Sequence, residues 1–159
     1  MIRSALPALI LLASCAASRP AEQANLPKGA FILPGTAVSD LLHQCSRAVP
    51  QQGEASWQPG VADVLALERA LPQALAKARP SGDWAKFPGQ WIRQYVGIVR
   101  HSRRYVYGNF APNDLPVGVS RSDISKWGLG ACDGGERFFG AEYDIAGQAI
   151  THLAFNGAV

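Results

Sequence analysis

The 159-residue sequence lacks the short patterns that usually mark a catalytic or metal site. It holds only 3 His and 3 Cys, and none of them has the Cys-x-x-Cys or His-x-x-x-His spacing of zinc ligands. No Ser lies in a Gly-x-Ser-x-Gly elbow, and no glycine-rich loop is followed by the Lys-Ser or Lys-Thr of a phosphate-binding loop. The sequence therefore indicates no catalytic residue, no metal site and no cofactor.

A large charge of one sign and a long apolar run are missing as well. The formal net charge of +3 is too small for a dedicated nucleic-acid binder, so we expect no nucleic-acid partner. No apolar run reaches the roughly 18 to 20 residues that span a bilayer. With 48% hydrophobic residues, a chain of this length fits one packed domain.

The start of the chain predicts export and lipid attachment. Met1-Ile2-Arg3 is a short positive start, and the apolar stretch at residues 5–13 has the length of a signal-peptide core. This stretch ends in Leu12-Ala13-Ser14-Cys15, which resembles a bacterial lipobox. We therefore expect residues 1–14 to be a lipoprotein signal peptide and Cys15 to carry the lipid that anchors the chain to a membrane.

Residues 15–35 mix small, polar and Pro residues and predict a flexible tether between the anchor and the domain. Ala16 stands where an Asp would favour retention in the inner membrane. The location expected in the bacterial envelope is therefore the periplasmic face of the outer membrane. The alternative is an ordinary secretory signal whose cleavage site happens to lie near a Cys.

The two remaining cysteines predict a disulfide. In an exported protein, Cys45 and Cys132 most simply pair with each other. They lie 87 residues apart. Closing a loop of that size stabilises the fold by about 4 kcal/mol in the chain-entropy model. A paired thiol is not a nucleophile, so neither sulfur is available for catalysis.

The domain at 36–159 is expected to be α+β. Apolar spacing predicts a helix over about 39–46 and a longer one over about 59–78, in which Pro72 predicts a kink or two abutting helices. Alternating β-branched and aromatic residues predict four strands, at 91–99, 104–110, 138–144 and 149–155, with a short edge strand near 31–33. Residues 50–58 and 111–131 are expected to be loops. The element order favours N-terminal helices packed on a four-stranded antiparallel sheet of two hairpins, arranged as in cystatins.

The tip of the first predicted hairpin is the candidate binding site. It concentrates positive charge at an exposed turn, with two tyrosines on one strand face nearby: Arg100, His101, Arg103, Arg104, Tyr105 and Tyr107. Such a tip suits a periplasmic protein or an anionic envelope polymer as partner. The simpler alternative is a charged turn that protects the sheet edge from aggregation.

Two carboxylates on a later strand are the candidate for catalysis. Glu142 and Asp144 lie two residues apart and therefore share a strand face, and His152 of the next strand is a third candidate. A glycosidase needs two carboxyl groups across a cleft. Adjacent carboxylates on a solvated strand face are the simpler explanation, with His152 as a hydrogen-bonded strand residue.

Several motifs lie between residues 57 and 157. They are Leu67-Glu68 with Leu71-Pro72, Arg93-Gln94-Tyr95 with Gly97, Cys132-Asp133-Gly134-Gly135, Phe138-Phe139-Gly140, Tyr143-Asp144 and Leu153-Ala154-Phe155-Asn156-Gly157. On these motifs the chain resembles a group of small proteobacterial lipoproteins and exported proteins without an assigned activity. The resemblance implies an exported single domain and no catalytic residue.

Together these observations favour a non-enzymatic, lipid-anchored periplasmic binding module. It is expected to be an envelope accessory protein, or an inhibitor or immunity protein against a cell-wall-degrading enzyme. One alternative is a small hydrolase of envelope polymers that uses Glu142, Asp144 or His152. The other is a purely structural lipoprotein.

Overall fold

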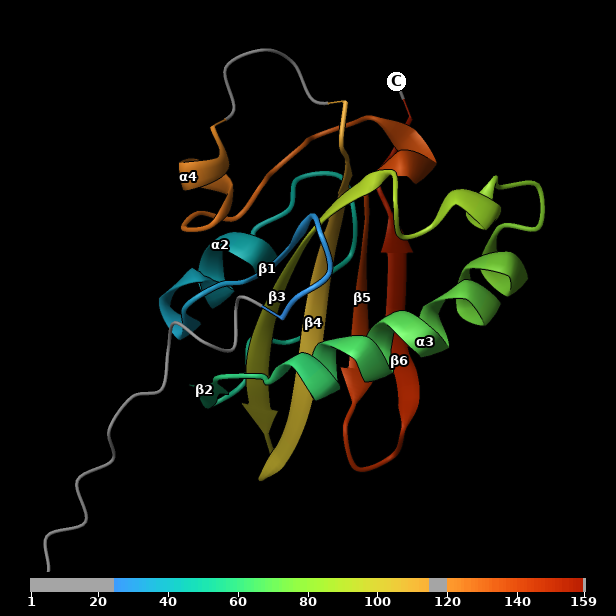
Figure 1. The fold of residues 1–159 in the computed structure, drawn as a ribbon. Coiled ribbons are helices and arrows are strands. Elements are labelled where there is room, and N and C mark those ends of the chain that lie inside the picture. The colour runs from blue at the N-terminus through green and yellow to red at the C-terminus, as the bar shows by residue number, and fades with distance from the viewer. Residues whose placement is uncertain (1–24, 115–119, 159) are drawn as a thin grey trace, which may run out of the picture.

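The computed structural model describes residues 25–114 and 120–158, and over these ranges the chain is an α+β domain (Figure 1). Its strands are β1 (Ala30–Ile32), β2 (Ala55–Trp57), β3 (Trp91–Arg100), β4 (Arg103–Pro112), β5 (Phe139–Asp144) and β6 (Ala149–Phe155). They form one six-stranded sheet in the order β1-β3-β4-β5-β6, with β2 also paired to β3. The four-stranded sheet predicted is therefore too small: β1 lies near the short edge strand expected at 31–33, and β2 was not expected, because three residues are too few for alternation to be recognised.

The two long hairpins follow the predicted pattern. β3 and β4 pair antiparallel along their whole length, from Trp91 opposite Pro112 to Arg100 opposite Arg103. β5 pairs with β4 on one side and β6 on the other, both antiparallel. β1 runs parallel to the start of β3, and β2 runs antiparallel to its end, so both short strands share the outer edge of β3.

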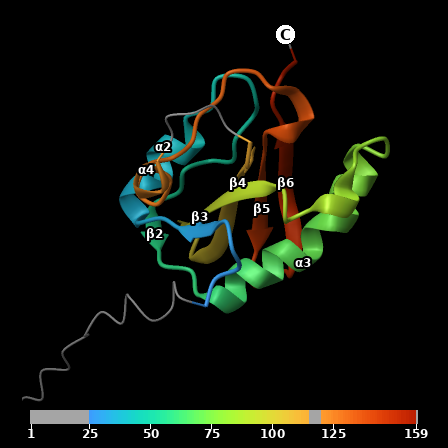
Figure 2. The ribbon, with the colours of Figure 1, turned by 45° about the horizontal axis from the view of Figure 1, so that its top comes forward.

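One face of the sheet is covered by α3 (Val61–Ala78), as Figures 1 and 2 show. Its apolar stripe is fully buried against aromatic and aliphatic strand residues. The helix contributes Val64, Leu67, Leu71 and Leu75, and the strands contribute Trp91, Tyr95, Val106, Phe110, Phe139 and Ala141. Pro72 is exposed and lies inside one continuous helix, so the alternative of two abutting helices is wrong. Pro72 removes one backbone hydrogen bond of the helix, but the buried apolar stripe remains continuous.

The opposite face carries the shorter helices α2 (Val38–Leu42) and α4 (Arg121–Ile124), which Figure 2 shows close together. A second apolar cluster joins Leu33, Val38 and Leu41 to the strand residues Ile98 and Tyr107. α2 ends four residues earlier than predicted. The segment that follows it is joined to the segment before β5 by the Cys45–Cys132 disulfide, which confirms that prediction.

The domain begins earlier than the sequence indicated. Residues 30–33, assigned above to the tether at 15–35, include β1 and the buried Leu33, and Leu26 packs against the main core. The predicted signal peptide and Cys15 lie outside the described residues. Over the two ranges that are described, none of the helices combines the length and apolarity needed to cross a bilayer.

Candidate functional site

The β3–β4 hairpin ends in a two-residue turn with an uncommon backbone conformation. His101 and Ser102 have φ values of 49° and 60°, in the left-handed region where a two-residue hairpin turn usually places Asn and Gly. The backbone N–H of Ser102 donates to Oε1 of Glu54 at 3.2 Å. The backbone N–H of Glu54 in turn donates to the carbonyl of Val99 at 3.0 Å. The hydrogen bond from Ser102 lowers the pKa of the Glu54 carboxyl. Through these two hydrogen bonds of Glu54, the loop before β2 braces the turn.

Arg100, at the end of β3, turns back over the sheet. Its Nη2 donates to Oε1 of Glu142 at 2.6 Å, and its Nη1 donates to the carbonyl of Gln51 at 2.7 Å. The guanidinium lies 4.2 Å from the centre of the Tyr105 ring. The side chains of Arg100 and Glu142 are 13% and 2% exposed. The hydrogen bond to Glu142 raises the pKa of Arg100, so this is a largely buried, charged pair.

Arg103, at the start of β4, pairs with Asp144 in the same way. Its Nη2 donates to Oδ2 of Asp144, whose Oδ1 accepts the backbone N–H of Ala146 at 3.1 Å. Asp144 is buried, although Arg103 is half exposed. The expectation that Glu142 and Asp144 lie on a solvated strand face is therefore wrong. Their burial is possible because an arginine from the neighbouring hairpin compensates each charge.

Arg104 points to the other face of the hairpin tip. Its guanidinium lies 5.2 Å from the centre of the Trp57 ring, and Nε1 of Trp57 donates to the carbonyl of Tyr105 at 3.0 Å. Among the residues that the structure describes, Arg104 makes no ion pair. The positive charge of the tip is thus mostly compensated, and His101 and Arg104 are its exposed basic side chains that form no ion pair with a described residue.

The two tyrosines of the predicted site lie beneath its surface. Tyr105 is half-buried under Arg100, and Tyr107 is fully buried. Nη2 of Arg47 donates to the Tyr107 hydroxyl at 3.4 Å, and burial raises the pKa of that hydroxyl. Tyr107 therefore belongs to the core beneath the hairpin and presents no contact surface to a partner, which corrects its assignment to the binding site. The segment around α2 covers it, and the strand pattern gave no sign of that cover.

The residues of the alternative catalytic site come together on one sheet face, but each already has a partner within the protein. Glu142 and His152 are cross-strand neighbours on β5 and β6. Oε1 of Glu142 accepts the Thr151 hydroxyl at 2.8 Å in addition to Arg100, and Nε2 of His152 lies 3.0 Å from the carbonyl oxygen of Ala48. Within residues 25–114 and 120–158, no group of three or more His, Cys, Asp or Glu side chains is placed to hold a metal ion.

A buried polar cluster between α3 and β3 was missed by the sequence analysis. The hydroxyl of Tyr95 donates to Oε1 of Glu68 at 2.6 Å, and Nε of Arg93 lies 3.3 Å from the same oxygen. Nη2 of Arg93 also donates to the carbonyl of Lys28 at 2.7 Å, which ties the entry of the chain to the core. The only signal was a Glu inside the apolar stripe of a helix and an Arg inside a buried strand. We assign this cluster to the fold, since all three side chains are enclosed.

No protein-family profile, curated protein or solved structure matches this chain. The resemblance to small proteobacterial lipoproteins and exported proteins therefore stays a prediction. Function is argued below from the residues and their contacts.

Proposed function

We propose that this chain is a lipid-anchored binding module of the bacterial envelope that presents the β3–β4 hairpin tip to a periplasmic protein. The observation that carries the proposal is the exposed two-residue turn at His101 and Ser102, held in the left-handed region. Non-glycine residues in that region are strained, and such strain concentrates at functional positions. Because Glu54 and the Arg100–Glu142 pair brace the turn, little conformational freedom remains to be lost when it binds.

A protein partner suits the tip better than an anionic polymer does. Arg100 and Arg103 are committed to Glu142 and Asp144, so their charges attract a polyanion only weakly. The arginine and tryptophan that stack beside the turn, Arg104 and Trp57, are residue types enriched in protein–protein interfaces. An exposed, braced turn of this kind suits the cleft of a cell-wall-degrading enzyme, with this chain as inhibitor or immunity protein. If this chain is instead an envelope accessory protein, it binds its partner through the same surface.

The anchor and the location belong to the same proposal. Support comes from the lipobox-like Leu12-Ala13-Ser14-Cys15 and from the Cys45–Cys132 disulfide, which is typical of exported proteins. The periplasmic face of the outer membrane is the proposed location. We also propose that α3 across the antiparallel hairpins corresponds to the cystatin-like arrangement expected from the element order, with β1 and β2 as additions at one edge.

A hydrolase built on Glu142, Asp144 and His152 has less support. Each of the two carboxylates is buried and bound to an arginine, and a general acid or base must reach its substrate. Activating Glu142 would require breaking its contacts with both Arg100 and Thr151.

Site-specific photo-crosslinking tests the binding proposal. A photoreactive amino acid is placed at Arg104 in one strain and at Lys77, an exposed residue of α3, in a matched strain. The expected result is a discrete adduct with one periplasmic protein from position 104 and no such adduct from position 77. With that partner purified, His101→Ala/Arg104→Ala should weaken binding at least tenfold, and Arg69→Ala/Lys77→Ala should leave it unchanged. Equal adducts from both positions, or equal affinities of both double variants, would overturn the proposal.

A further inference from the structure

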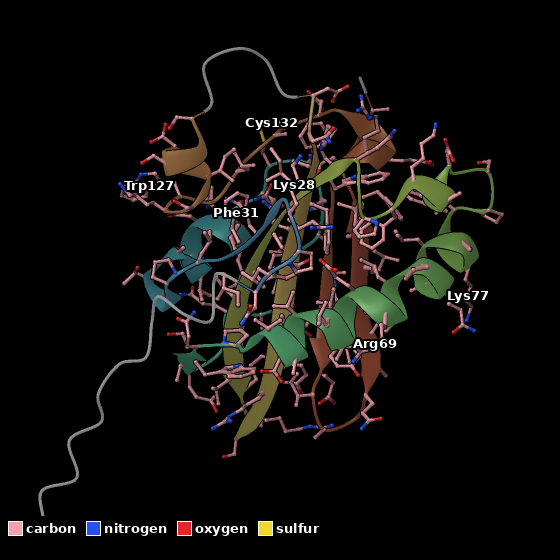
Figure 3. All side chains as sticks on the ribbon, viewed as in Figure 1. Lys28, Phe31, Arg69, Lys77, Trp127 and Cys132 are labelled. Atoms are coloured by element: carbon pink, nitrogen blue, oxygen red, sulfur yellow. A yellow bond between two sulfur atoms is a disulfide. The ribbon has the colours of Figure 1, made fainter. Side chains whose placement is uncertain are left out.

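A solvent-exposed tryptophan stands on the side of the domain that carries α4. Trp127 is the large hydrophobic side chain that the described residues leave exposed, at 63%. Figure 3 shows it at the outer edge of the molecule. The backbone at Trp127 is held in place, because Nε2 of Gln94 donates to the carbonyls of Ile124 and Trp127, both at 2.7 Å. A tryptophan side chain combines a large apolar ring with one polar N–H, which suits a boundary between apolar and aqueous surroundings.

The surface beside Trp127 is formed by the first described residues of the chain. Two hollows, of about 340 and 260 Å³, share Lys28 and Phe31. Ile124 lines the first hollow, and Leu26 and Ser125 line the second, so the chain entry and the α4 segment are neighbours. Lys126 and Trp127 directly follow Ser125 in the chain, and Lys28 and Lys126 are both exposed. We name this surface, formed by Leu26, Lys28, Phe31, Lys126 and Trp127, the α4 face.

The α4 face combines apolar contact with positive charge. Aromatic rings such as that of Trp127 favour the boundary between lipid headgroups and hydrocarbon. Each basic residue beside an anionic lipid surface strengthens binding by about 1 kcal/mol, or roughly fivefold. Two exposed carboxylates also lie nearby: Asp123, whose Oδ2 accepts the Ser120 hydroxyl at 2.6 Å, and Asp40, whose backbone lies against Gly128. Their charges offset part of the attraction to anionic headgroups, so Trp127 and the short tether carry the docking and the two lysines add to it.

The length of chain before the domain brings this face to a bilayer. Leu26 follows Cys15 by only eleven residues, which span at most about 40 Å when fully extended. A lipid on Cys15 therefore holds the α4 face within reach of the headgroups. β3 leads away from this face, because Trp91 at its start lines the first hollow and Arg100 at its end adjoins the hairpin tip. Ten strand residues place the tip about 30 Å from the face.

We infer that the α4 face rests on the anionic phospholipid surface and directs the hairpin tip away from the membrane. This inference rests on the proposed lipid anchor. It adds what the α4 face binds and the direction in which the hairpin tip points. The docked state is set by Trp127 in the headgroup region and by Lys28 and Lys126 beside anionic headgroups.

The test supplies the anchor chemically, so that it does not depend on natural acylation. The mature chain from residue 15 is coupled through its free Cys15 to vesicles of phosphatidylethanolamine and phosphatidylglycerol (3:1) that contain a maleimide lipid. A nitroxide lipid labelled near the headgroup then quenches tryptophan emission within its reach. The expected result is quenching in the wild type that Trp127→Phe lowers strongly, because Trp91, which also lines this face, is only 7% exposed. Lys28→Glu/Lys126→Glu should lower the docking equilibrium constant about 25-fold or more, since at least two fivefold contributions are lost.

The matched control reverses two charges on α3, in Arg69→Glu/Lys77→Glu, and should leave quenching unchanged. Quenching of the same size in Trp127→Phe as in the wild type, or quenching that both charge variants reduce equally, would overturn the inference. A change in Trp127 emission that depends on protein concentration without vesicles would also overturn it, since the occupant would then be a second copy of the chain. If the natural protein proves not to be acylated, the anchor proposal fails, whereas the vesicle result reports on the face alone.

Discussion

Replacing Arg100 with Ala is expected to destabilise the fold far more than replacing Arg104, although both arginines lie at the same hairpin tip. Arg100 is 13% exposed and pairs with Glu142, which is 2% exposed. Removing one partner of a buried ion pair leaves an uncompensated charge and costs about 3–5 kcal/mol. Arg104 is exposed and stacks on Trp57, an arrangement that contributes about 0.5–1 kcal/mol.

The double variant Arg100→Ala/Glu142→Gln separates charge from packing. The glutamine side chain that it introduces is neutral and keeps an oxygen that accepts the Thr151 hydroxyl, so the double variant should be at least about 1 kcal/mol more stable than Arg100→Ala alone. Urea unfolding followed by circular dichroism gives the free energy of unfolding of each protein. Equal losses in Arg100→Ala and Arg104→Ala, or a double variant less stable than Arg100→Ala, would refute the assignment of Glu142 to a structural ion pair.

Three further predictions concern stability. Ser102→Gly should raise the free energy of unfolding by about 0.5–1 kcal/mol, because φ at this position is 60°; an unchanged or lower value by urea unfolding would contradict the strain argument. Replacing both Cys45 and Cys132 with Ala should lower it by about 4 kcal/mol, and a loss below about 1 kcal/mol would show that the bridge constrains little. Burial, with the neighbouring Glu68 carboxyl, raises the pKa of Tyr95 well above its ordinary value. Stability should therefore be intact below about pH 10 and fall above it by up to about 1.4 kcal/mol per pH unit per buried phenol. Tyr95→Phe should flatten that fall above about pH 10, and an identical slope would contradict the assignment.

The elements with a strong period were predictable from the sequence. Alternation over ten residues located β3 and β4, and the spacing of Val64, Leu67, Leu71 and Leu75 located α3. Two cysteines left over after the predicted lipid-bearing Cys15 predicted the disulfide. In each case the prediction needed only the pattern of neighbouring residues or the number of cysteines.

What the sequence missed depends on contacts between distant segments. Arg100 and Glu142 are 42 residues apart, and alternation assigns both to a strand face without saying what covers it. The basic tip was therefore predicted as an open positive patch, and the buried Tyr107 as part of the candidate binding site. β1 was expected only as a short edge strand, and β2 not at all, because three residues carry too little pattern and their pairing with β3 is set by packing.

The account depends most directly on the chemical state of the three cysteines, which intact-mass analysis of protein extracted from membranes reads in one measurement. The predicted mass is that of a chain beginning at Cys15, increased by lipid and lacking two hydrogens for the Cys45–Cys132 bond. Alkylation without prior reduction should leave this mass unchanged. A chain recovered without lipid from the soluble fraction, or one that gains two alkyl groups at Cys45 and Cys132 before reduction, would contradict the assignment as an exported, lipid-anchored protein.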